Sequence, residues 1–332
     1  SSLRCFSSPV RPSPAAACPR IMAAPRAIAA AIAIIGASAQ DIPRRLRIVN
    51  GCEKAPIWIA HIAAGTPGPD PQDQRIMPGE SYDFLTPDNL HATRYWPKMG
   101  CDNDGNNCVI GDSGGPAEAC VRRDQGWDDY SQCAPPVDTK FEASFGVNGR
   151  PCNPMTPGGV DMFGCDYIDI SLVDGYTLPV HMKIEGGECQ DSRGGSRVEE
   201  IDCRDLTFDH CPAEQVLPAL NMNVSLRAVK PGTDIVAGCF SPCLRLLDDK
   251  WIKEPQRYAE GEGVNQYCCP TPPVTPNQCR EGPVTRTDFI KVVHEKCRGA
   301  YGYAYDDDVG LLRCSSASRY IVTYFCPTSW PP

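Results

Sequence analysis

The sequence predicts a mainly β protein, a flattened β-sandwich with two smaller disulfide-rich lobes. Two observations lead to this prediction. Stretches in which apolar and polar residues alternate, as in strands with one buried face, cluster in the spans 45–100, 137–202 and 298–330. The intervening spans, 101–136 and 203–297, are rich in cysteine, proline and glycine, so we expect two loop-rich lobes there, the second with short helices.

Composition indicates an oxidising compartment. The 332 residues include 20 cysteines, 33 prolines and 29 glycines. Cytosolic thiols are kept reduced, so this cysteine content predicts a secreted protein of the extracellular space or cell wall. Five histidines and the lack of repeated Cys-x-x-Cys pairs argue against zinc, and we expect no metal and no cofactor. The net charge of −9 disfavours nucleic acid and anionic membranes as partners.

The N-terminal residues 1–39 have the pattern of an upstream segment followed by a signal peptide that starts near Met22. An apolar run, 27–35, precedes a small-residue cleavage site at 37–39. The run is too short to span a bilayer, which requires about 20 residues. We therefore expect a mature chain that begins near Gln40, without a transmembrane anchor.

The clearest strand lies within Cys165–Tyr176. Its apolar residues Ile168, Ile170 and Leu172 alternate with Asp169, Ser171 and Val173, and Asp174-Gly175 then supplies a turn. Because carboxylates are disfavoured in strands, Asp169 needs a reason to be there.

The remaining patterns are weaker. They predict strands within 46–52, 57–60, 75–84, around 94–96 and at 180–184. The best helix candidate is 287–296, where Thr287 can cap an apolar face.

The string DYIDISLVDGY, residues 166–176, closely resembles the signature strand of thaumatin-like proteins, and the flanking segments resemble that family from about residue 46 to 328. The resemblance implies a secreted protein, which we expect to be monomeric. It also projects one acidic cleft, formed by Arg94, Glu142, Asp169, Asp174 and one of Asp306 or Asp307. Taken singly, each residue has an ordinary explanation as a solvated arginine, a turn former or a polar loop. Strand parity alone would place Asp174 opposite Asp169, and only a bend at the Asp-Gly turn can bring it round.

Members of that family bind β-1,3-glucan, some hydrolyse it weakly, and many are antifungal. Carboxylates near one arginine accept hydrogen bonds from sugar hydroxyls, and their mutual repulsion raises the pKa of at least one of them. The first expectation is a defence or cell-wall protein that binds β-1,3-glucan or another cell-wall polysaccharide. The alternative is a weak endo-β-1,3-glucanase with Glu142 as the acid of raised pKa and Asp169 as nucleophile or base. A minor alternative is inhibition of a protease or amylase through surface loops.

The segment 111–116, GDSGGP, matches the sequence of the trypsin-like nucleophile motif. That chemistry needs a histidine base and an aspartate that orients it. His61 and His91 are the only histidines between the Ile48-Val49-Asn50-Gly51 stretch and this motif, and neither has the expected Ala-His-Cys setting. We therefore do not expect a serine protease. The thaumatin-like family has Thr-Gly-Asp-Cys-Gly-Gly here, so the resemblance implies that Ser113 replaces a cysteine.

That replacement changes the expected disulfides. The family implies the pairs Cys52–Cys326, Cys101–Cys108, Cys189–Cys314, Cys203–Cys297, Cys211–Cys239, Cys243–Cys268 and Cys269–Cys279. Four cysteines remain, which allows three pairings. Loop proximity favours Cys120–Cys133 and Cys152–Cys165, the second pair closing an insertion at 146–164.

Asn223-Val224-Ser225 is the only glycosylation sequon. In a secreted chain from a eukaryotic host we expect Asn223 to be exposed and glycosylated.

Overall fold

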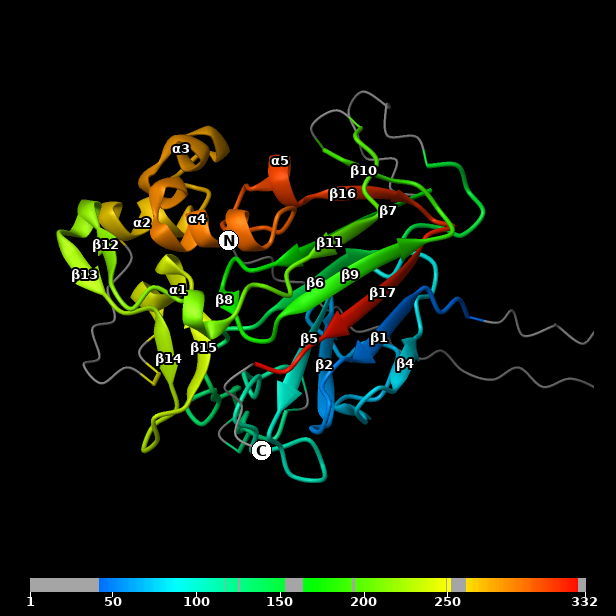
Figure 1. Cartoon of the computed structure of the whole chain (residues 1–332), viewed down its shortest axis with the longest axis horizontal. Coiled ribbons are helices and arrows are strands. Elements are labelled where there is room, and N and C mark those ends of the chain that lie inside the picture. The colour runs from blue at the N-terminus through cyan, green and yellow to red at the C-terminus, as the bar shows by residue number, and fades with distance from the viewer. Residues whose placement is uncertain are drawn as a thin grey trace, which may run out of the picture. The chain divides into compact units, whose positions relative to one another are not determined.

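Two β-sheets contain most of the strands (Figure 1). The computed structural model describes residues 42–327 apart from 117, 125, 153–163, 193–194, 249 and 252–260, so the expected leader and the start near Gln40 lie outside the described residues. The five-stranded sheet has the order β11-β9-β17-β1-β4, with β1 Leu46–Asn50, β4 Ser81–Phe84, β9 Val180–Glu185, β11 Glu200–Asp202 and β17 Arg319–Tyr324. The seven-stranded sheet has the order β10-β16-β7-β6-β5-β2-β3, with β2 Ile57–Ala63, β3 Gln74–Ile76, β5 Thr93–Met99, β6 Lys140–Ser144, β7 Cys165–Ser171, β10 Cys189–Asp191 and β16 Leu312–Ser315. The mainly β fold class is confirmed.

The core lies where the two sheets face each other. Fully buried residues of both sheets include Leu46, Ile48, Ile168 and Ile170. Two ring contacts cross between the sheets, Phe84–Tyr95 with centroids 5.2 Å apart and Phe141–Tyr320 at 5.9 Å. Alternation along each strand therefore sends one set of side chains into this core and the other set to the outer face.

A buried ion pair also joins the two sheets. Arg45, just before β1, contacts Asp166 of β7 at 2.7 Å. The same carboxylate accepts hydrogen bonds from the Tyr320 hydroxyl at 2.7 Å and from the Gly146 amide at 2.8 Å. Burial raises the pKa of Asp166, whereas Arg45 and these donors act in the opposite direction. These polar partners thus stabilise the Asp166 carboxylate between the apolar faces of the two sheets.

The 203–297 region contains both strands and helices. Its strands form two small sheets: β12 Gln215–Leu217 pairs with β13 Met222–Val224, and β14 Arg227–Val229 and β15 Val236–Phe240 join β8 Gly175–Tyr176. Its helices are α1 Pro242–Leu247, α2 Glu262–Cys268, α3 Pro276–Glu281 and α4 Asp288–Lys296, with 3₁₀ turns at Phe208–His210, Pro218–Leu220 and Pro283–Arg286. Thr287 caps α4 by accepting a hydrogen bond from the Ile290 amide at 3.3 Å. The sequence did not indicate the strands because they are too short to show alternation.

The 101–136 region is attached to β5 by a buried lysine. The ammonium of Lys98 lies 2.8 Å from Asp73 and 2.5 Å from Glu118. Burial raises the pKa of Glu118 to about 8, against the opposing effect of Lys98. In the GDSGGP motif, Ser113 is buried and its hydroxyl donates to Asp138 at 2.7 Å, so its partner is a carboxylate rather than a histidine.

Nine disulfides link the described cysteines. They have the same pairing as expected above, including Cys120–Cys133 and Cys152–Cys165. Peptide mapping under non-reducing conditions is the measurement that tests this pairing. Asn223 is exposed on β13, and its amide lies 3.5 Å from Glu214. Occupancy of the sequon stays a prediction.

Arg45→Met should destabilise the fold strongly, because it leaves Asp166 without its cation between the sheets. We expect the free energy of unfolding to fall by about 3–5 kcal/mol in denaturant titrations at neutral pH. Arg47→Met is the matched control, since the Arg47–Asp83 pair is about one-third exposed and should be worth about 0–1 kcal/mol. Equal losses in the two variants would contradict the role of the buried pair.

Candidate functional site

A cavity of about 460 Å³ lies on the outer face of the seven-stranded sheet, over β5, β6 and β7. We call it the carboxylate cavity. It is lined by Arg94, Glu142, Asp169, Ser171, Val173, Asp174, Tyr301, Ala304 and Tyr305. Four of the residues expected from the sequence, Arg94, Glu142, Asp169 and Asp174, therefore meet in one place.

Strand register creates the charged row on the cavity floor. Arg94 is directly opposite Glu142, and Glu142 is directly opposite Asp169. Because Phe141 and Ile170 point into the core, their neighbours must point out of it. The Arg94 guanidinium lies 3.0 Å from the Glu142 carboxylate. Opposed residues have Cβ atoms about 4.5–5.5 Å apart, which brings the two carboxyl groups close enough to interact.

Asp174 reaches the same cavity through a turn. The Gly175 amide donates to the Leu172 carbonyl at 3.0 Å, and Gly175 has φ +128°, a left-handed conformation that favours glycine. A Cβ on Gly175 would also lie 2.1 Å from the Cys239 carbonyl oxygen. The turn brings the Asp174 carboxylate to the buried ammonium of Lys140. This turn is the bend that Asp174 needs in order to reach the same face of the sheet as Asp169.

Tyr301 forms a wall of the cavity. Its amide donates to the Ile170 carbonyl at 2.9 Å, and its carbonyl accepts from the Leu172 amide at 2.8 Å. The segment therefore runs parallel to the end of β7, beside it. Gly310 leaves room for the ring, because a Cβ there would lie 2.3 Å from it. Sequence reasoning missed Tyr301 and also Lys140. The available signal was spacing, since Lys140 precedes Glu142 by two residues and so shares its face.

Asp306 and Asp307 have different positions, and neither lines the cavity. Asp306 is buried, contacts His294 at 2.7 Å and accepts from the Gly302 amide at 3.0 Å. Asp307, at the start of α5 Asp307–Gly310, accepts from the Tyr301 hydroxyl at 2.8 Å. Of the two, Asp307 supports the cavity wall, and Asp306 fastens the neighbouring loop to α4.

The carboxyl pair has perturbed acidity. Burial raises the pKa of Asp169 well above its usual value, and the charge of Glu142 raises it further. Burial also raises the pKa of Glu142, but Arg94 and then Lys140 oppose that effect. The pKa of Glu142 is therefore raised above its usual value, which is the direction expected from the sequence. The direct ion pair with Arg94 favours the ionised form of Glu142.

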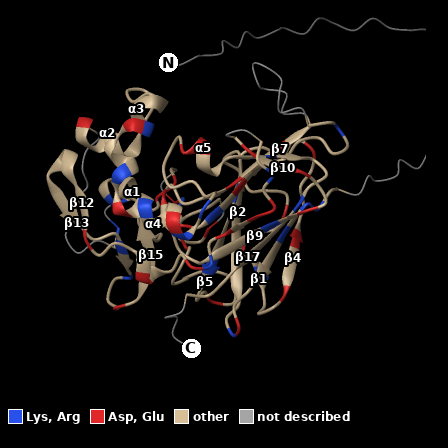
Figure 2. Ribbon diagram, turned by 45° about the horizontal axis from the view of Figure 1, so that its top comes forward, with Lys and Arg blue, Asp and Glu red and all other residues tan. Residues whose placement is uncertain are grey.

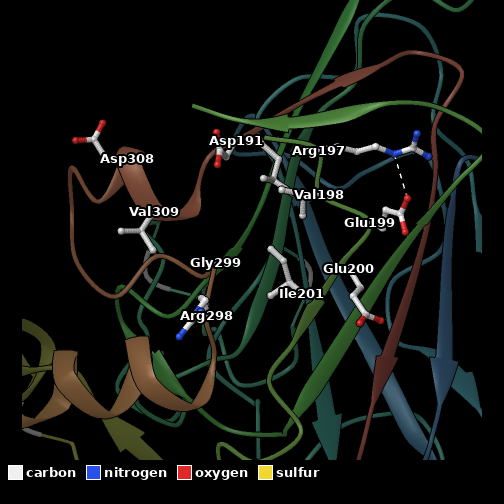
Figure 3. A pocket seen from close by; sticks show the side chains of 11 residues that line it. Asp191, Arg197, Val198, Glu199, Glu200, Ile201, Arg298, Gly299, Asp308 and Val309 are labelled. Carbon is white, nitrogen blue, oxygen red and sulfur yellow. Dashed lines mark ion pairs between the residues drawn. The ribbon is translucent and has the colours of Figure 1, made fainter. Parts of the chain in front are cut away.

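A second cavity, of about 580 Å³, lies at the sheet edges near β10, β11 and α5 (Figure 3). Its apolar lining residues are Val198, Ile201, Val309 and Leu312. Its rim includes the Arg197–Glu199 ion pair at 3.1 Å. None of the residues expected at the site lines it. The carboxylate cavity, where Arg94, Glu142 and Asp169 lie opposite one another on adjacent strands, is the stronger candidate. Figure 2 shows the acidic and basic residues of the chain on its ribbon.

Among the described residues, no group of three or more His, Cys, Asp or Glu side chains is arranged to hold a metal ion. None of the helices in this part of the chain has the length and hydropathy that a membrane span requires.

Comparisons with known proteins agree on a family. The model of the thaumatin family matches residues 154–327. The chain is 28% identical over 239 residues to thaumatin-like protein 1a of Malus domestica, covering 70% of each chain. It is 27% identical over 240 residues to a protein of Prunus avium named glucan endo-1,3-beta-glucosidase, covering 70% of this chain and 71% of that one. Among solved structures, the family 64 laminaripentaose-producing β-1,3-glucanase of Paenibacillus barengoltzii matches over 88% of this chain and 78% of that chain. The identity is 13% and the TM-score is 0.40.

Asp169→Asn should stabilise the protein at neutral pH. The folded state holds the Asp169 proton more tightly than the unfolded state, so stability is lost as pH rises from the unfolded pKa, about 3.9, through the raised folded pKa. Asparagine removes this loss, and we expect a gain in the free energy of unfolding at pH 7 that disappears near pH 3. Asp83→Asn is the control of opposite sign, because Arg47 lowers the pKa of Asp83. Thermal unfolding across this pH range measures both, and a pH-independent effect of Asp169→Asn would contradict the assignment.

Proposed function

The chain belongs to the thaumatin family, and from this membership we propose that it is a secreted protein whose carboxylate cavity binds β-1,3-glucan in a defence or cell-wall role. The observation that carries the proposal is the composition of the cavity lining. Glu142, Asp169 and Asp174 offer oxygen atoms to sugar hydroxyls, and Arg94 offers donors. Tyr301 and Tyr305 add aromatic surface above this polar floor. A few placed polar groups beside aromatic rings are typical of small-ligand sites.

The cavity is open to a ligand at its charged row. The side chain of Arg94 is 56% exposed and that of Glu142 is 26% exposed, so a sugar can reach both without displacing a strand. Both side chains come from strands in the interior of the sheet, β5 and β6. Rigid strands hold polar groups in place before the ligand arrives, which reduces the ordering cost of binding.

Glu142→Leu should weaken binding to β-1,3-glucan by roughly tenfold or more, because a lost hydrogen bond to a charged group is worth about 1.5–3 kcal/mol. Glu200→Leu is the matched control, since Glu200 lines the other cavity. Co-sedimentation with insoluble β-1,3-glucan and titration with its soluble oligomers both measure the effect. Failure of the unmodified protein to bind, or equal losses in the two variants, would overturn the proposal.

A second candidate function is weak endo-β-1,3-glucanase activity. A protonated carboxyl beside an ionised one is the arrangement that glycoside hydrolysis uses, and the Prunus avium relative carries the name of such an enzyme. Both pKa values are raised, but that of Asp169 lies well above its usual value, so we assign the two roles in the opposite order to that expected from the sequence. Asp169 would be the acid, and Glu142, kept ionised by Arg94, would be nucleophile or base. Inhibition of a protease or amylase, the minor alternative, remains a prediction without a structural argument.

If the protein hydrolyses β-1,3-glucan, both Asp169→Asn and Glu142→Gln should abolish the release of reducing ends. Asp169→Asn should leave binding largely intact, because loss of an acid acts mainly on the transition state. Aryl glycosides of β-1,3-glucan oligomers separate the two roles, since a good leaving group needs no proton. Asp169→Asn should still release the phenol, and Glu142→Gln should not. The opposite result would restore Glu142 as the acid, and no turnover by the unmodified protein would leave only binding.

A further inference from the structure

Lys140 is a buried cation next to the carboxylate cavity. It lies two residues before Glu142 on β6, and its side chain is 11% exposed. Burial lowers the pKa of a lysine, but here Asp174 and then Asp138 outweigh burial, so the pKa of Lys140 is raised and the ammonium persists. Lys140 contacts the Asp174 carboxylate directly. The cavity therefore has a cation that the family resemblance did not imply.

A second acid completes the surroundings of Lys140. Asp138 is 2% exposed and accepts a hydrogen bond from the Ser113 hydroxyl at 2.7 Å. Burial raises the pKa of Asp138 to about 6, and Lys140 acts in the opposite direction. Ser113 stands where the family resemblance implies a half-cystine, which would have no such donor. Asp138 thus accepts from Ser113 and acts on Lys140 through its charge, while Lys140 contacts Asp174.

The charges around the carboxyl pair are uneven. Lys140 and Arg94 both act on Glu142 and favour its ionised form. On Asp169, Arg94 is opposed by Glu142 and by Asp307. Tyr301 also faces the pair, and its raised pKa keeps it neutral. Two cations therefore favour an ionised Glu142 against one anion, Asp174. On Asp169, by contrast, one cation, Arg94, is opposed by Asp307, and the repulsion between the two carboxyl groups acts on both.

We propose that Lys140 is a positioning residue of the carboxylate cavity, which anchors Asp174 and directs the proton shared by Glu142 and Asp169 to Asp169. Arg94 pairs with Glu142 and Lys140 pairs with Asp174, so two of the three carboxyl groups at the cavity have a cation as partner. Such a cavity selects neutral sugar polymers over cationic amino-sugar polymers.

The inference depends on the proposed function only for its consequence in sugar binding. The position of the proton is a property of the free protein. Carboxyl ¹³C NMR titrations of the unmodified chain should show Asp169 titrating at higher pH than Glu142. In Lys140→Met the Glu142 titration should move up by about one pH unit, as expected when a nearby cation is removed. Lys140→Arg should restore it, and Lys183→Met, which removes an exposed lysine on β9, should change nothing.

Binding provides the second readout. Lys140→Met adds one net negative charge, so the ratio of affinities for chitosan oligomers over β-1,3-glucan oligomers should rise several-fold. Glu142 titrating above Asp169 in the unmodified protein would overturn the proposal, even if Lys140→Met failed to fold. So would an unchanged Glu142 titration in a folded Lys140→Met variant. The expected titration order without any retention on β-1,3-glucan would overturn the proposed function instead.

Discussion

The candidate site depends on the register of β5, β6 and β7. Phe141 and Ile170 occupy the core, so Glu142 and Asp169 have only the outer face available. A slip of one residue would bury both carboxyl groups and expose both apolar side chains, at a cost far above that of any single contact. The energy of core packing therefore aligns the charged row, and no dedicated contact between the carboxyl groups is needed to bring them together.

The same arrangement explains why charge has to be balanced with care. A carboxyl group raised on a strand above an apolar core is poorly solvated, and the fold tolerates it only beside cations or as the neutral acid. Arg94 and Lys140 provide the cations, and we propose that Asp169 is the neutral acid. Between the sheets, the cation Arg45 and the hydroxyl of Tyr320 stabilise the Asp166 carboxylate.

Much of the fold could be predicted from the sequence, because alternation identifies strands such as β7 and the spacing of cysteines identifies the family. Four of the cavity residues were expected for the same reason. The rest required three-dimensional neighbours. Three consecutive aspartates do not indicate by themselves which one lies nearest the cavity, so the choice between Asp306 and Asp307 stayed open. The ion pair between Arg94 and Glu142 likewise depends on cross-strand register rather than on sequence proximity.

The pairing of β1 with β17 has a consequence for biosynthesis. β1 is translated long before its parallel partner, β17, and the Cys52–Cys326 bond spans 274 residues between the same regions. Because β17 lies between β1 and β9, a nascent chain cannot assemble the five-stranded sheet until β17 has been translated. Until then β1 has an unpaired edge, which chaperones would have to shield from other chains.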